Sequence, residues 1–447
     1  MRTSRVAVAI ALLAAAACKK PTTTTTTPTI TTSTSTSTTR PPTTTTRPPT
    51  TTTSTVTTTS STTLPAFGAP YADGYLGFYD ANTIPLWPTK MILMLGEANA
   101  QGPLIANAKH VAATAGNGDA KFIFYQSLTD MDSRCSCNDQ FFFDGWKTVH
   151  PEWILKDASG NWVSTSNGIG RLWATDIGNL AYVDAWADWA LAKMDQYGWD
   201  GTFADNIFRG YFGSWSATPI NPRTGQAYTA AQYRKDMLAA LQRLRTRYDA
   251  RGKILIGNHT SAWDPATFAD PVTQQEILTM HGVEMEDCVY DWNANRQNEA
   301  SWLAQLAYLD YANQHGVRSI CSGPAGTIGN TTDRWYILAS YLLTKEGFSS
   351  VAEINSVSTW WSGLDYQLGA PLGRFYCLDP AAGLAKTGSC PSTGKIFVRD
   401  WQNGRVLVNP TAATTVTVPL GTTMTDPNGA RVTSVMLAPG SGTALRR

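Results

Sequence analysis

Short apolar runs alternate with longer amphipathic stretches through most of the chain after residue 90. Each run has the length and composition of a strand that is buried on both faces of a sheet. We therefore predict eight strands, at residues 91–96, 121–127, 172–176, 200–205, 253–258, 282–289, 318–322 and 349–353.

Amphipathic helices are predicted between several of these strands. Thr229 can cap a helix that carries Met237 and Leu241 on one face, and similar helices follow Asn298 and Thr332. Alternation of strands and helices predicts a parallel sheet, and eight repeats predict an α/β fold of the (β/α)8 TIM barrel type. A doubly wound open sheet is the alternative.

The pattern changes at two places. The connection between residues 127 and 172 is unusually long, and long insertions after barrel strands generally shape the substrate cleft. Beyond Asp365, short alternating runs without a helical pattern predict an antiparallel β-sandwich. The predicted domains are a catalytic barrel at residues 65–364 and a C-terminal β-sandwich at residues 365–447.

The N-terminal region has a different composition. Two arginines precede an apolar run that is too short to span a bilayer, so residues 1–17 are predicted to be a signal peptide. The segment ending at Cys18 resembles the lipobox of bacterial lipoproteins, in which this cysteine is lipidated; an ordinary cleaved signal is the alternative. Residues 18–64 are rich in Thr, Ser and Pro and are predicted to be a disordered tether. We expect an exported, extracytoplasmic protein that is lipid-anchored to the bacterial cell envelope.

Charge and cysteine content narrow the partners. Lys and Arg number 35 against 34 Asp and Glu, so there is no global basic field to bind nucleic acid. Six cysteines follow Cys18, and in an exported protein they are expected to form disulfides. Cys377 with Cys390 would close one loop, and Cys288 with Cys321 would join the ends of neighbouring strands, although the connectivity stays open.

Acidic residues follow three of the predicted strands. In a barrel, only residues at the carboxyl ends of strands reach the shared cleft, and Asp205, Glu286 and Glu353 have such positions. Hydrolysis of a glycosidic bond needs two carboxyl groups, for which we select Asp205 and Glu286. Glu284 is an alternative to Glu286, because strand alternation puts both on one side; Glu286 lies nearer the strand end. Asp200 begins its strand and is expected on the opposite, stabilising face.

Polar and aromatic residues near the strand ends are candidates for substrate contact. A sugar offers hydroxyl groups to polar side chains and apolar faces to aromatic rings. The candidates are Tyr125, Asp130, Trp173, Asp176, Asn206, Asn258, His259, Trp292 and Glu353. Each also has a structural alternative: Asp176 suits the entry to a helix, and tryptophans suit a core.

Other catalytic schemes find no support in the sequence. There is no GxSxG elbow, no GxxxxGK[ST] phosphate loop and no HExxH helix. We therefore predict neither a metal nor an organic cofactor.

Several motifs together resemble a known family. The run at residues 199–206, the upstream segments 150–153 and 172–179, and Glu286 resemble the hypothetical glycosyl hydrolase family fifteen, which is related to the α-galactosidase and endo-α-1,4-polygalactosaminidase superfamily. The resemblance covers residues 71 to 445. It implies that Asp205 is the nucleophile and Glu286 the general acid/base.

The expected function is hydrolysis of a polysaccharide or glycoconjugate by a monomeric surface enzyme. A catalytically inactive glycan-binding lipoprotein is the alternative. The sequence leaves retention and inversion both open.

Overall fold

The computed structural model describes residues 74–76, 91–97, 102–116, 118–132, 143–164, 172–207, 215–259, 264–291, 295–324, 331–346, 349–354, 361–388 and 390–447. The predictions made for the signal peptide, for Cys18, for the tether at 18–64 and for Trp292 lie outside these residues.

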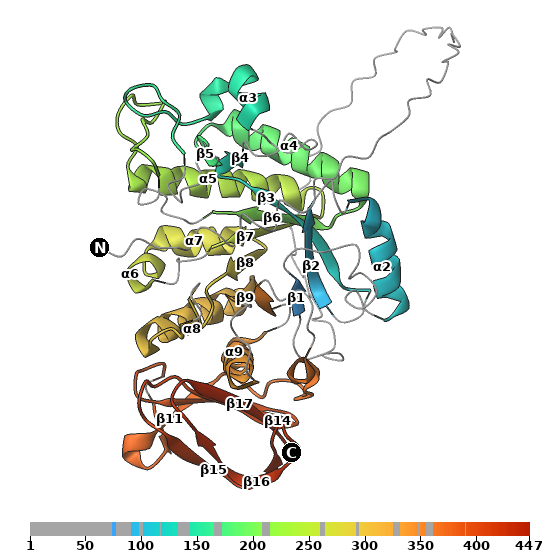
Figure 1. Ribbon diagram of the computed structural model, residues 1–447, viewed down its shortest axis with the longest axis vertical. Coiled ribbons are helices and arrows are strands. Elements are labelled where there is room, and N and C mark those ends of the chain that lie inside the picture. The colour runs from blue at the N-terminus through green and yellow to red at the C-terminus, as the bar shows by residue number, and fades with distance from the viewer. Residues whose placement is uncertain are drawn as a thin grey trace, which may run out of the picture.

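The chain is a mixed α/β protein with a curled parallel sheet (Figure 1). Its hydrogen-bonded order is β1-β10-β9-β8-β7-β6-β3-β2, and β1 pairs with both β10 and β2. The strands are β1 (Gly74–Leu76), β2 (Met91–Glu97), β3 (Lys121–Ser127), β6 (Gly201–Asp205), β7 (Ile254–Asn258), β8 (Gly282–Met285), β9 (Arg318–Pro324) and β10 (Ser350–Ile354).

One predicted strand lies elsewhere. Residues 172–176 were expected in the parallel sheet, but β5 (Leu172–Ala174) pairs antiparallel with β4 (Asp130–Asp132) in a separate two-stranded sheet. The prediction was wrong because this run is short and half-buried, whereas a central parallel strand is buried on both faces. The place in the parallel sheet is taken by β1, whose three residues give only a weak strand pattern.

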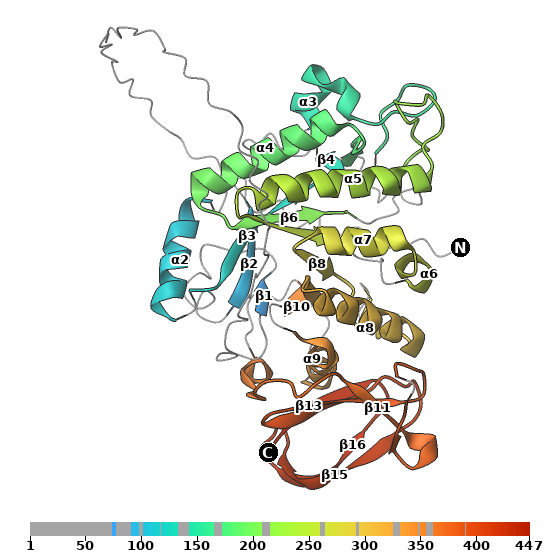
Figure 2. The same ribbon diagram turned by 180° about the vertical axis from the view of Figure 1, so that it is seen from behind.

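Helices cover the outside of the parallel sheet (Figures 1 and 2). Asn179 caps α4 and Asn298 caps α8, and Thr229 forms a capping box with Gln232 at the start of α5. The caps of α5 and α8 are the ones that the sequence predicts. The helices are α2 (Ile105–Thr114), α3 (Phe143–Val149), α4 (Leu180–Tyr197), α5 (Ala230–Asp249), α6 (Pro265–Phe268), α7 (Pro271–Thr279), α8 (Glu299–Gln314) and α9 (Thr331–Thr344).

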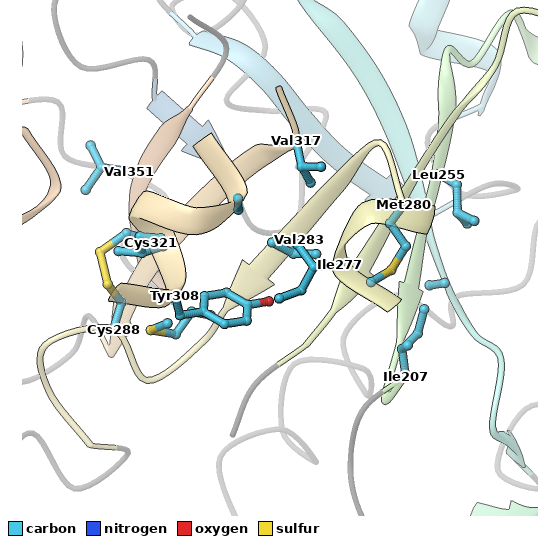
Figure 3. Packing of buried hydrophobic residues seen from close by; sticks show 14 of the residues in the cluster. Ile207, Leu255, Ile277, Met280, Val283, Cys288, Tyr308, Val317, Cys321 and Val351 are labelled. Atoms are coloured by element: carbon cyan, nitrogen blue, oxygen red, sulfur yellow. A yellow bond between two sulfur atoms is a disulfide. The ribbon is translucent and has the colours of Figure 1, made fainter. Parts of the chain in front are cut away.

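The main core lies between the sheet and these helices. Val283 of β8 faces Ile277 of α7 and Tyr308 of α8, all three fully buried (Figure 3). The same view shows the disulfide between Cys288 and Cys321. This bond and the Cys377–Cys390 bond confirm both expected pairings; Cys135 and Cys137 lie outside the described residues.

The C-terminal region forms one antiparallel sheet of seven strands, in the order β12-β11-β13-β14-β17-β15-β16. The antiparallel prediction is confirmed, but the two sheets of a sandwich are replaced by a single sheet that bends over the apolar cluster containing Val398, Leu407 and Val418. Its strands are β11 (Tyr376–Asp379), β12 (Ala385–Lys386), β13 (Ile396–Trp401), β14 (Gly404–Asn409), β15 (Val416–Thr425), β16 (Arg431–Leu437) and β17 (Ser441–Arg446).

Helix α9 connects the two sheets (Figures 1 and 2). Arg399 of β13 is only 2% exposed and donates to the backbone carbonyls of Leu343 and Lys345, at 3.1 and 2.7 Å. These carbonyls end the helix without intrahelical partners, so the guanidinium both caps α9 and attaches it to the C-terminal sheet. Within the described residues, no helix has the length and apolar character needed to cross a membrane.

Candidate active site

The inner face of the curled sheet changes from apolar to polar along the strands. An apolar cluster is formed by Ile123, Phe203, Ile256 and Ile320. Side chains alternate across a strand, so the residue two positions further on faces the same side. Two positions toward the carboxyl ends stand Tyr125, Asp205, Asn258 and Ser322. Glu284 of β8 lies opposite Asn258 of β7 and Ile320 of β9, so its side chain faces the same inner side.

The Asp205 carboxylate accepts hydrogen bonds on both oxygens. Tyr125 Oη donates to Oδ2 at 2.6 Å, and Asn258 Nδ2 donates to Oδ1 at 2.8 Å. The backbone N–H of Asn206 adds a bond of 2.7 Å to Oδ1. Hydrogen bonds to a carboxylate are short and directional, so these three donors fix the orientation of the Asp205 side chain.

Asn206 turns the chain where β6 ends. Its φ of 60° lies in the left-handed region, which asparagine adopts more readily than most residues. Its side-chain nitrogen Nδ2 lies 3.1 Å from Asp130 Oδ2 and 3.3 Å from Asp205 Oδ2. Asn206 therefore joins Asp205 to Asp130 of β4, and four predicted contact residues lie together around Asp205.

Glu284 is a buried acid in the same row. It is 3% exposed and accepts a hydrogen bond of 2.7 Å from Ser322 Oγ. Burial raises the pKa of Glu284 well above its ordinary value, and the charges of Glu286 and Asp205 raise it further, whereas the Ser322 bond lowers it.

Glu286 lies in the turn that follows β8 and is half-buried. Because its charge and that of Asp205 both act on Glu284, the three carboxyl groups occupy one region at the carboxyl end of the sheet. Two residues after Glu286, the Cys288–Cys321 bond ties this turn to β9 with a Cα–Cα distance of 5.2 Å. The arrangement can supply an anchored carboxylate and a second carboxyl group to one ligand.

A family comparison covers this whole region. The model of the hypothetical glycosyl hydrolase family 15 matches residues 115–404, which is more than half of the 447 residues. The chain belongs to this family. No curated protein matches.

Solved structures similar to this family 15 chain include glycoside hydrolases at 11% identity. A noncanonic maltogenic alpha-amylase from Thermotoga neapolitana has a TM-score of 0.48, with 84% of this chain and 96% of that chain covered. An alpha-amylase from Lactobacillus plantarum has a TM-score of 0.46, with 80% and 92% covered. A cycloalternan-degrading enzyme from Trueperella pyogenes has a TM-score of 0.47, with 84% and 62% covered.

His259 of the family 15 chain does not reach the polar row. Its side chain has no exposed surface, and its ring nitrogens lie 2.8 Å from Tyr308 Oη and 3.3 Å from Glu276 Oε2. Strand alternation explains this correction: Asn258 faces inward, so the next residue faces the helices. His259 is therefore a structural residue behind Asn258.

Asp176 also makes contacts within the protein. It is 2% exposed, and Arg223 Nη1 lies 2.8 Å from both of its oxygens. The backbone N–H of Gly178 donates to Oδ1 at 3.2 Å, just before α4 begins. These contacts fit the helix-entry alternative, and the substrate contact of Asp176 stays a prediction.

The remaining candidates are less closely tied to Asp205. Trp173 is half-buried on β5 and makes an edge contact with Trp162, with ring centroids 6.4 Å apart. The backbone of Glu353 lies in β10, between β9 and β1, and its side chain is not among those described. Asp200 binds Lys109 Nζ at 2.6 Å at the opposite end of β6, as its position predicts.

Ser322 was missed by the sequence analysis. A serine carries no distinctive motif, but it stands two positions after the inward-facing Ile320, and this parity could have found it. In the described part of the chain, no group of three or more His, Cys, Asp or Glu side chains is arranged to hold a metal ion.

Proposed function

We propose that this family 15 chain is a glycoside hydrolase whose reaction depends on Asp205 and Glu286. The observation that carries the proposal is the Asp205 carboxylate, which is fixed by Tyr125, Asn258 and Asn206 at the carboxyl end of the curled sheet. The charges of Glu286 and Asp205 both raise the pKa of Glu284, which supports a location of both acids near it, and glycoside hydrolysis requires two carboxyl groups.

The reaction begins when Glu286 gives its proton to the glycosidic oxygen as the bond from that oxygen to the anomeric carbon breaks. Asp205 either attacks the anomeric carbon or removes a proton from the water that attacks it. In the first course a glycosyl ester forms; water then attacks its anomeric carbon while giving a proton to Glu286, and the bond to Asp205 breaks. In the second course Asp205 releases the water's proton to solvent, and Glu286 takes one up from solvent. Each course consumes one water molecule; the first retains the anomeric configuration and the second inverts it.

The substrate class is a polysaccharide or glycoconjugate. Tyr125, Asp130, Asn206 and Asn258 offer polar groups for sugar hydroxyls beside Asp205. Trp173, Trp292 and Glu353 remain proposed contacts. The surrounding scaffold is proposed to be a complete (β/α)8 barrel, because β1 pairs with the strands at both ends of the remaining order.

The cellular setting follows from the N-terminal sequence. We propose that Cys18 is lipidated and that residues 18–64 hold the monomeric catalytic domain away from a bacterial membrane. This places the enzyme outside the cytoplasm, where the disulfides form.

The test is release of reducing ends from a panel of bacterial and plant polysaccharides. Asp205→Asn and Glu286→Gln are expected to lower the rate by about 100-fold or more, because each removes a group that moves charge or a proton in the reaction. Asp200→Asn is the matched control, since Asp200 lies at the other end of the same strand. Equal rates in wild type and Asp205→Asn would reject the assignment. Glycan binding without release by the wild type would favour the inactive glycan-binding protein.

A further inference from the structure

Three carboxyl groups at one site exceed what the proposed hydrolysis uses. Asp205 and Glu286 have roles in that reaction, whereas Glu284 is without one. It lies on the inner face between Asn258 and Ser322, and only 3% of its surface is exposed. A buried acid beside two others needs a physical account.

The surroundings of Glu284 differ from those of Asp176, another buried acid. Asp176 is equally buried, and it is bound by the Arg223 guanidinium and a backbone N–H. For Glu284, the contact within the described residues is the neutral hydroxyl of Ser322, which is itself fully buried. One neutral hydrogen bond does not offset the cost of burying a carboxylate beside like charges.

We propose that Glu284 is a positioning residue that stays uncharged, anchored to β9 through Ser322, so that Asp205 alone carries the charge on the inner face and Glu286 remains the proton donor. This rests on the proposed function for the roles of Asp205 and Glu286. The hydroxyl of Ser322 donates to one oxygen of the Glu284 acid, and the acid proton stays on the other oxygen. Glu284 therefore neither loses nor gains a proton in the reaction cycle.

A buried, protonated Glu284 predicts how the stability of the folded chain changes with pH. The titratable groups that act on Glu284, among the described residues, are Asp205 of β6 and Glu286 of the turn after β8. The pKa of Glu284 is higher in the folded chain than its unfolded value of about 4.3. The folded state then binds more protons, so its stability falls as pH rises from that value through the folded pKa. Glutamine has the shape of the neutral acid and removes this dependence.

The first experiment needs no substrate. Infrared spectra of the full chain at neutral pH are expected to contain the C=O band of a protonated carboxyl that Glu284→Gln removes and Glu286→Gln keeps. The urea midpoint of Glu284→Gln is expected to exceed that of the wild type increasingly as pH rises. Identical wild-type and Glu284→Gln spectra would overturn the proposal. If the variant does not fold, carbon-13 titration of glutamate-labelled Glu286→Gln decides, because one glutamate side chain must stay protonated at neutral pH after the proton donor has been removed.

The second experiment separates Glu284 from the reacting acids. On any glycan that the wild type cleaves, Glu284→Gln is expected to keep the rate within about threefold, whereas Glu286→Gln loses about 100-fold or more. Equal losses in the two variants would make Glu284 itself a reacting acid and overturn its positioning role. A wild type that cleaves no glycan would count against the proposed function alone, since the spectra and the urea midpoints still decide the state of Glu284.

Discussion

Tyr125 Oη lies 2.6 Å from Asp205 Oδ2, across the junction of β3 and β6. The tyrosine ring stacks on Phe203, with centroids 6.2 Å apart and planes inclined by 24°. Phe203 precedes Asp205 by two positions on the same inner face, so the apolar layer holds the ring while its hydroxyl binds the carboxylate. The orientation of Asp205 thus depends on packing one layer below it.

Removing this hydroxyl is expected to weaken catalysis. A hydrogen bond to a charged group contributes about 1.5–3 kcal/mol, so Tyr125→Phe is expected to lower the rate of glycan hydrolysis by about 10- to 100-fold. Tyr248→Phe is the matched control, because Tyr248 Oη binds Thr202 Oγ1 on the outer face of the same strand at 2.9 Å. Steady-state kinetics of both variants measure the effect. A comparable loss in Tyr248→Phe would show that general damage to β6, and not the Asp205 contact, controls activity.

A charge at Asn258 is expected to make stability depend on pH. Asn258 is 5% exposed and donates to Asp205, so Asn258→Asp would place two carboxyl groups in contact. Such a pair raises the pKa of one member, and stability then falls as pH rises through that range. We expect a deficit of about 3 kcal/mol at neutral pH that shrinks in acid. Urea unfolding at about pH 5 and about pH 8 measures it. Asn258→Ala should show a deficit that does not change with pH, and parallel curves for both variants would contradict the account.

Strand parity explains why much of the site was predictable. Once β3, β6 and β7 are recognised, alternation puts Tyr125, Asp205 and Asn258 on the inner face, and hydrophobic runs alone locate these strands. Helix caps were equally readable, since Thr229 and Asn298 act locally.

Features that depend on distant partners were not predictable. Residues 172–174 form a strand, but their antiparallel pairing with Asp130–Asp132 is a tertiary choice that local composition does not encode. From the sequence, strand alternation puts Glu284 and Glu286 on the same side, but it does not predict which of the two side chains is more deeply buried. Their difference arises because Ser322 and the neighbouring strands enclose Glu284 while the turn leaves Glu286 half-buried.

The disulfide beside Glu286 is expected to support activity as well as stability. The Cys288–Cys321 pair spans a sequence separation of 33, against 13 for Cys377–Cys390. Loop-closure entropy predicts losses of about 4 and about 3 kcal/mol when each pair is changed to alanine. Only the first pair holds the turn that carries Glu286, so only its removal should lower glycan hydrolysis as well. Activity and urea midpoints of the two double variants test this. Equal activity losses would assign the effect to stability alone.

Arg223 is expected to be required for the stability of the folded chain because it neutralises the charge of Asp176. Its guanidinium lies 2.8 Å from both Asp176 oxygens and is 37% exposed, whereas the Asp176 side chain is 2% exposed. Burial raises the pKa of Asp176 and the arginine opposes this, while Asp176 in turn raises the pKa of Arg223. Arg223→Met leaves a buried carboxyl without its cation, which costs about 3 kcal/mol, the low end of the range for buried pairs because the arginine is partly exposed.

The loss of stability caused by Arg223→Met is expected to become smaller as the pH is lowered, because protonation of Asp176 removes the unpaired charge. Urea unfolding of the variant in acid and at neutral pH measures this. Arg251→Met is the matched control: its pair with Asp195 has side chains 49% and 50% exposed, and such pairs contribute about 0–1 kcal/mol. If both variants lost the same free energy of unfolding, burial of Asp176 would not be the cause. Asp176 lies just before the first turn of α4. A confirmed loss of stability in Arg223→Met would therefore assign Asp176 to the scaffold that supports the site.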